Sequence, residues 1–177
     1  MHVQVLTRWL GYLEHATPRL LGVFGANAGK GGCTIFAQTL WDRQRVNLMG
    51  LPWCAVFVHA VLDRPDLLGR AHPGCRVLQR RMRRRGLWRG RDYAPQLGDL
   101  IFCSNRRTRR VDHVGIVEYA DGDRVVSIDG NTVDPSGTFA PREGGAVARR
   151  IRQRTDPVIV GYGAIGKLWY KEESASG

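Results

Sequence analysis

Apolar residues recur at helical spacing through the first half of the chain. This spacing predicts an amphipathic helix over residues 3–15 and further helices over residues 35–42 and 75–85. A fourth helix is expected to begin near Pro52, because proline is tolerated in the first helical turn, and to end before Pro65. The first half of the chain is therefore predicted to be mainly helical.

The pattern changes after residue 95, where short apolar runs rich in β-branched residues alternate with polar turns. These runs predict five strands, over residues 100–103, 114–118, 125–128, 146–151 and 158–162. The acidic Asp-Gly-Asp triplet between the second and third runs fits a tight hairpin. Helices followed by strands indicate an α+β fold, in which helices pack against one side of an antiparallel sheet.

No internal repeat and no linker divides the 177 residues, so one domain is expected over residues 1–170. Residues 17–33 contain Pro18 and five glycines, which predicts a loop between the first two helices. Residues 171–177 are polar and are predicted to form a disordered tail. Asp99 precedes a predicted strand, where its carboxylate is expected to form a turn or cap bond.

The chain is strongly basic, with 27 Lys and Arg against 16 Asp and Glu and a net charge of +11. This charge predicts attraction to a polyanion, with arginines in residues 80–85 and 106–110 as candidate contacts. A solvated surface without a partner is the alternative. No apolar run approaches the roughly 18 residues of a membrane span. Residues 1–9 lack the features of a secretory signal, so action outside the cytoplasm would need another export route.

Four cysteines, at positions 33, 54, 75 and 103, show neither CxxC spacing nor a Cys/His spacing suited to zinc. A chain of this length does not need a disulfide scaffold. We therefore expect Cys54 to be a free thiol, and the sequence leaves the state of the other three open.

Cys54 lies in the predicted first turn of the helix that starts near Pro52. Unpaired N–H groups and the positive end of the helix dipole favour an anion there, and a thiolate is a nucleophile. The alternative is a small buried cysteine on a core helix, which is common for this residue type. Partners further along the chain favour the nucleophile.

His113 begins an otherwise apolar strand, from which its imidazole could act as a base. A histidine at the surface or bound in the core is the alternative. The next strand ends in Asp129-Gly130-Asn131, and a hairpin would place it beside the His113 strand. Either Asp129 or Asn131 could then accept the imidazole N–H and leave the other ring nitrogen for the thiol proton. These residues also suit a simple turn.

Four motifs follow one another along the chain: PWCAVFV at 52–58, PQLGDLIF at 95–102, HVGIV at 113–117 and IDGNT at 128–132. Their order is typical of the CHAP domain, and the chain resembles this family from about Gly11 to Gly166. CHAP domains are papain-like cysteine amidases and peptidases of the NlpC/P60 type that cut bacterial peptidoglycan. The resemblance implies a papain-like fold with N-terminal helices on an antiparallel sheet.

The resemblance also assigns roles to the candidate residues. It makes Cys54 the nucleophile, His113 the general base, Asp129 the residue that orients the imidazole, and Asn131 a second polar group beside the imidazole or substrate. Asp129 stands where the family usually has glutamate, so the division of work between Asp129 and Asn131 is open.

Two further features depart from the family pattern. Trp53 stands where many members have a glutamine that helps to form the oxyanion hole; the backbone N–H of Cys54 can supply one donor, and a second is not identified. Some relatives bind calcium through acidic residues near the nucleophile. Only Asp42 lies between Gly29 and Cys54, so we expect no metal and no cofactor.

The implied function is peptidoglycan hydrolysis, by an N-acetylmuramoyl-L-alanine amidase or an endopeptidase of a phage endolysin or bacterial lysin. Made in the cytoplasm, it would reach the cell wall after release or delivery. The expected partner is the cell-wall polymer, with no nucleic acid and no membrane span; the oligomeric state is open. One alternative is a non-lytic thiol hydrolase, transferase or toxin on the same fold. A weaker one is an Arg-rich nucleic-acid-binding module, which leaves Cys54, His113 and Asp129 unexplained.

Overall fold

The computed structural model describes residues 2–105, 110–133 and 144–170. The predicted tail at 171–177 lies outside these residues, as do residues 106–109 of the second basic segment. The family resemblance and the predicted strands fall almost entirely within the described part of the chain.

Six antiparallel strands form one sheet in the order β1-β6-β2-β3-β4-β5. The strands are β1 (Trp88–Arg89), β2 (Leu100–Ser104), β3 (Val111–Ala120), β4 (Arg124–Thr132), β5 (Ala146–Gln153) and β6 (Ile159–Gly163). Strands β3 and β4 form the predicted hairpin through the turn at 121–123. The sheet therefore contains all five predicted strands and the short edge strand β1, which was not predicted.

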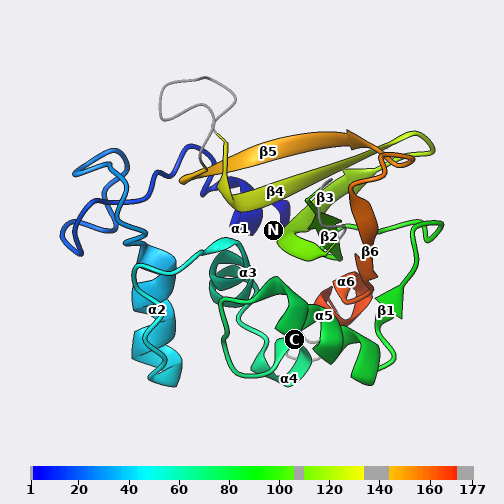
Figure 1. The fold of residues 1–177 in the computed structure, drawn as a ribbon, viewed down its shortest axis with the longest axis horizontal. Helices are drawn as coiled ribbons and strands as arrows, with labels where there is room; N and C mark the ends of the chain where they lie inside the picture. Colours follow the sequence, from blue (N-terminus) through cyan, green and yellow to red (C-terminus); the bar gives the residue numbers. More distant parts are fainter. Residues whose placement is uncertain (1, 106–109, 134–143, 171–177) are drawn as a thin grey trace.

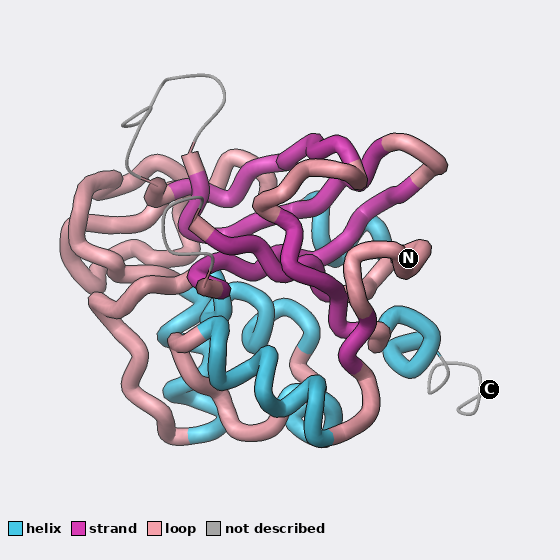
Figure 2. The backbone as a smooth tube through the Cα atoms, turned by 45° about the vertical axis from the view of Figure 1, so that its right-hand side comes forward, coloured by secondary structure: helices cyan, strands magenta, loops and turns pink. Residues whose placement is uncertain are grey.

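Helices α2 to α5 gather on one side of the sheet, as Figures 1 and 2 show. The helices are α1 (His2–Thr7), α2 (Ile35–Gln44), α3 (Cys54–Leu62), α4 (Pro65–Leu68), α5 (Cys75–Arg84) and α6 (Gly166–Tyr170). Helix α3 packs on β3 and β4, and α5 packs on β3. This arrangement confirms the predicted α+β fold; the short helices α4 and α6 were not predicted.

Helix α3 lies at the centre of the hydrophobic core and is buried along its whole length. Its side chains pack with Val114, Ile116 and Ile128, which project from β3 and β4 toward the helices. Because side chains alternate along a strand, His113 and Gly115 point to the opposite face of β3. The start of α3 and the start of β3 are thus held together by the core.

The boundaries of two predicted helices are explained by their caps. Thr34 is the N-cap of α2, and its Oγ1 accepts a hydrogen bond from Ala37 N. Threonine is among the residues preferred at this position. Gly86 follows α5 with φ +70°, a conformation that glycine adopts without strain. Local sequence determines both of these ends.

The helix predicted over residues 3–15 was too long, because α1 ends at Thr7. Gly11 has φ +84°, and the backbone N–H groups of Gly11 and Glu14 donate to the carbonyl oxygens of Val147 and Gly145. The chain after α1 therefore bonds to the strand β5 region instead of continuing the helix.

Asp99 forms the turn bonds that were predicted for it. Its Oδ2 accepts hydrogen bonds from Gln96 N at 2.8 Å and from the Tyr93 hydroxyl at 3.1 Å, while Oδ1 accepts one from Gly166 N at 2.8 Å. The carboxylate therefore ties the entrance of β2 to the start of α6, away from the candidate site.

Candidate active site

Cys54 is the first residue of α3, and its side chain is buried with 4% of its surface exposed. The N–H groups of this turn have no partner within the helix, so they present a positive field to the sulfur. Trp53 precedes the helix, and its carbonyl accepts the first helical bond, from Phe57 N at 2.8 Å. The helix start therefore fixes the position of the thiol.

His113 on β3 is hydrogen-bonded to Asp129 on β4, with 2.8 Å between Nε2 and Oδ2. The carboxylate can only accept, so Nε2 carries the proton of this bond. The other ring nitrogen, Nδ1, is then left to interact with the Cys54 thiol. The imidazole is 22% exposed, which leaves it accessible to a substrate.

Asp129 is completely buried, yet it accepts hydrogen bonds from three side chains. Besides His113 these are the Ser127 hydroxyl, at 2.6 Å from Oδ1, and Arg152 Nη2, at 2.7 Å from Oδ2. Burial alone would raise the pKa of Asp129, but the charges of Arg152 and His113 outweigh it and hold the pKa well below its usual range. Asp129 is thus an anion at neutral pH.

Gly115 makes room for this carboxylate. It lies two residues after His113 on the same face of β3, and a Cβ atom there would overlap Asp129 Oδ1. Any larger residue would push the carboxylate away from the imidazole. The contact with Asp129 therefore explains on steric grounds why a glycine stands in the HVGIV motif.

The Cys54 thiol is strongly acidic in this environment. A hydrogen bond with Cys75 lowers its pKa, burial raises it, and the hydrogen bond and positive charge of His113 lower it further, to about 4. Burial would lower the pKa of His113, but the charge and hydrogen bond of Asp129, together with Cys54, raise it to about 10. The two groups therefore favour a thiolate–imidazolium pair at neutral pH.

Asn131 is the next-to-last residue of β4, has φ +53° and lies on the wall of a cavity beside His113. Asp129, not Asn131, accepts the hydrogen bond from the imidazole. Cys54, His113 and Asp129 are thus brought together, whereas Asn131 lines the cavity beside them.

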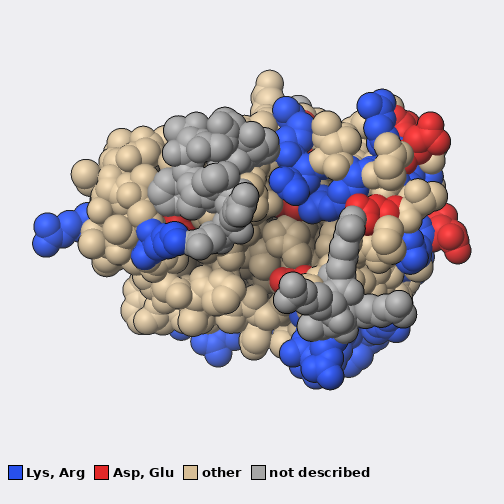
Figure 3. Space-filling view, turned by 45° about the horizontal axis from the view of Figure 1, so that its top comes forward, with Lys and Arg blue, Asp and Glu red and all other residues tan. Residues whose placement is uncertain are grey.

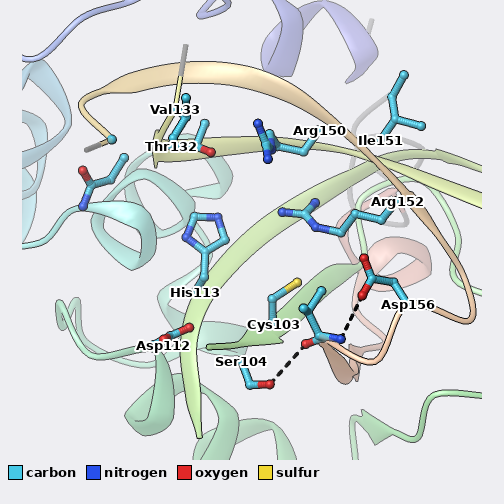
Figure 4. Close-up of a pocket in the computed structure, with 13 residues that line it drawn as sticks. Cys103, Ser104, Asp112, His113, Thr132, Val133, Arg150, Ile151, Arg152 and Asp156 are labelled. Atoms are coloured by element: carbon cyan, nitrogen blue, oxygen red, sulfur yellow. Dashed lines mark hydrogen bonds between the residues drawn. The ribbon is translucent and has the colours of Figure 1, made fainter. Parts of the chain in front are cut away.

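The cavity beside His113 has a volume of about 470 Å³. Figure 4 shows His113 and Arg152 pointing toward each other into it, from β3 and β5. Arg150 and Asp156 also line it, so its walls carry both signs of charge. It can accept a polar, peptide-like group next to the imidazole.

Trp53 does not offer its side chain to this site. The indole is 1% exposed, and its N–H donates to Glu14 Oε2 at 2.8 Å. The side chain at the glutamine position of the family is therefore engaged elsewhere, and the backbone N–H of Cys54 is left as the candidate oxyanion donor at the helix start.

Three contributing side chains were missed from the sequence: Ser127, Arg152 and Cys75. Ser127 could have been found, because it lies two residues before Asp129 and so on the same face of β4. Arg152 and Cys75 come from segments with no motif beside them.

Within residues 2–105, 110–133 and 144–170, no three His, Cys, Asp or Glu side chains are grouped so that they could hold a metal ion. In the same part of the chain, every helix is too short or too polar to cross a bilayer.

Comparison with known protein families matches residues 25–131 to the CHAP domain. The match covers more than half of the chain and contains Cys54, His113 and Asp129. A search of curated proteins finds no significant match. The family match confirms the resemblance found in the sequence and, together with the helices and sheet, the α+β papain-like fold.

Proposed function

We propose that this chain, which belongs to the CHAP domain family, hydrolyses an amide bond in the peptide part of peptidoglycan with Cys54 as the nucleophile. CHAP domains are hydrolytic amidase or peptidase domains that act on peptidoglycan, which supports the substrate class. The observation that carries the proposal is the meeting of Cys54 with the His113–Asp129 pair, in which charge favours a thiolate.

Acyl transfer to sulfur is the reaction that these groups support. The Cys54 thiolate attacks the amide carbonyl, and the backbone N–H of Cys54 stabilises the oxyanion. The His113 imidazolium gives its Nδ1 proton to the leaving amine as the C–N bond breaks. Neutral His113 then takes a proton from water, whose oxygen attacks the thioester and releases the acid and the thiolate. Asp129 orients the ring throughout.

The finer assignments rest on the family resemblance. The bond cut is the N-acetylmuramoyl-L-alanine amide or a bond within the peptide stem or cross-bridge, and Asn131 contacts the substrate in the cavity. On this proposal the chain acts as a phage endolysin or a bacterial lysin, and it reaches the cell wall after release or delivery.

Basic surface supports attachment to the anionic wall. Helix α5 exposes most of its arginines, and its hydrophobic residues Leu78 and Met82 face the core. Figure 3 shows groups of Lys and Arg on the face that it presents, with Asp and Glu beside some of them. Wall binding should therefore weaken as salt screens these charges.

The test uses purified cell walls and a matched pair of cysteine variants. Cys54→Ala is expected to abolish wall solubilisation and the release of new amino groups, because it removes the nucleophile. Cys33→Ser, which changes another buried free thiol, is expected to keep activity. Wall solubilisation by folded Cys54→Ala would rule out the thiol mechanism. A folded wild type that releases no amino groups from walls would favour the non-lytic thiol hydrolase.

A further inference from the structure

A second thiol lies against the candidate nucleophile. Cys75 is the first residue of α5, as Cys54 is of α3, and their Sγ atoms are 3.3 Å apart. Both sulfurs also approach the carbonyl oxygen of Asp112, Cys75 at 3.5 Å and Cys54 at 4.0 Å. The starts of two helices and of the His113 strand therefore converge on one pair of sulfur atoms.

The two thiols are buried and free, and they differ in pKa. Cys54 and Cys75 are 4% and 5% exposed, and neither is in a disulfide. The hydrogen bond with Cys54 and burial strongly raise the pKa of Cys75, while the pKa of Cys54 falls to about 4. These shifts favour the proton on Cys75 in the hydrogen bond that joins the two sulfurs.

This distance is close to what a covalent bond needs. A disulfide has an S–S length of about 2.0 Å, so the two sulfurs would have to approach by roughly 1.3 Å. Both cysteines are in the first turn of a helix, where a side-chain rotation does not disturb the helix behind it. The remaining cysteines differ: Cys33 bonds to the carbonyl of Gly31, and Cys103 lies on β2.

We propose that Cys54 and Cys75 form a site of reversible oxidation, in which a peroxide oxidises Cys54 and Cys75 then closes a disulfide that blocks the nucleophile. The proposal rests on the proposed function only in taking Cys54 as the nucleophile. It assigns to Cys75 the role of resolving thiol, which nothing in the hydrolytic reaction requires.

The chemistry needs only a peroxide as oxidant. The Cys54 thiolate attacks one peroxide oxygen; an S–O bond forms, the O–O bond breaks, and hydroxide leaves and takes a proton to become water. Cys75 then loses its proton, and its sulfur attacks Cys54. The S–S bond forms as the S–O bond breaks, and a second water leaves. Two thiols have lost two electrons, and the peroxide has gained them.

Oxidation of Cys54 favours the attack of Cys75 that follows it. The negative charge on Cys54 opposes ionisation of Cys75, and that charge is gone once Cys54 is a sulfenic acid. Cys75 then ionises more readily, and thiolate attack on the sulfenic sulfur becomes faster. The disulfide also prevents further oxidation to the sulfinic acid, which thiol reductants do not reverse.

Peptide mapping of the oxidised wild-type protein tests the proposal directly. Trypsin places Cys54 on the peptide 46–70, because it does not cut before Pro65, and Cys75 on the peptide 71–76. After peroxide, alkylation of free thiols and digestion without reductant, we expect these two peptides to be joined with the loss of two hydrogens. Dithiothreitol should separate them. Oxidation of Cys54 to a sulfinic acid without this link would overturn the proposal.

Activity of two matched variants gives the second arm. Wild type and Cys33→Ser are expected to lose wall hydrolysis in peroxide and to regain it fully in dithiothreitol. Cys75→Ser is expected to lose it without recovery, because its Cys54 sulfenic acid has no resolving thiol and is oxidised by further peroxide to the sulfinic acid, which dithiothreitol does not reduce. Equal recovery of Cys75→Ser and wild type would contradict the role of Cys75. A joined peptide in a protein that never cuts walls would reject the proposed function alone, whereas wall hydrolysis without a joined peptide would reject the oxidation site alone.

Discussion

Arg152 should stabilise the folded site through Asp129, and replacing it with methionine isolates this effect. Methionine keeps an unbranched apolar stem and removes the guanidinium. The change removes two hydrogen bonds, from Nη2 to Asp129 at 2.7 Å and from Nη1 to Ser127 at 2.8 Å. It also leaves a completely buried carboxylate with His113 as its one remaining ionic partner among the described residues.

The size of the effect follows from these contacts. Both bonds are donated by the charged guanidinium, and a hydrogen bond to a charged group contributes about 1.5–3 kcal/mol. Breaking a buried ion pair costs about 3–5 kcal/mol. Because the Arg152 side chain is only 12% exposed, solvent compensates little. We therefore expect Arg152→Met to lower the free energy of unfolding by about 3 kcal/mol.

Urea denaturation of Arg152→Met and Arg150→Met provides the comparison. Arg150 lies two residues away on the same face of β5 and lines the same cavity, but no ion pair joins it to a described carboxylate. Its replacement should change the free energy of unfolding by less than about 0.5 kcal/mol. Because the folded state lowers the pKa of Asp129, the difference should be full above about pH 5 and should shrink below about pH 4. Equal stabilities of the two variants at pH 7 would refute the role assigned to Arg152.

Two further predictions concern the Cys54 thiolate and the space that Gly115 leaves for the Asp129 carboxylate. The pKa of Cys54 is lowered to about 4 and that of His113 is raised to about 10, so iodoacetamide should alkylate Cys54 at a nearly constant rate from about pH 5 to 9. Peptide mass spectrometry measures this rate. In His113→Ala the hydrogen bond with Cys75 still lowers the pKa of Cys54 but the imidazolium no longer does, so the rate should begin to fall at a higher pH than in the wild type, and an unchanged profile would contradict the ion pair. Gly115→Ala should reduce kcat for wall hydrolysis by about 10²-fold through displacement of Asp129. Gly122→Ala in the open turn is its control, and equal kcat values would exclude the steric role.

The core of the site was predictable because each residue had a local signal. Pro52 before an apolar run indicated the helix start, and that start places Cys54. The turn between two β-branched runs indicated a hairpin, which brings Asp129 beside His113. These inferences needed only helix capping, strand alternation and hairpin geometry.

The remaining contacts depend on long-range packing that local signals do not contain. Arg152 lies opposite Val125 in the β4–β5 register, so its side chain must reach along the sheet to contact Asp129. Cys75 meets Cys54 because α3 and α5 pack with their first turns together on β3. Neither the strand register nor the packing of two helices is set by the residues around Arg152 or Cys75.

Alternation of charge explains how a buried site can hold a thiolate. In a medium of low dielectric, an acid and a base in contact tend to share the proton as a neutral pair. The positive charge of Arg152 favours the ionised form of Asp129 and so keeps the proton on His113. The negative charge of Asp129 in turn favours the imidazolium, which keeps the proton away from Cys54. Arg152 on β5 therefore acts on the Cys54 sulfur through Asp129 and His113. The negative charge that makes Cys54 a nucleophile also makes it reactive toward peroxides, and the proposed disulfide with the adjacent Cys75 would keep that oxidation reversible.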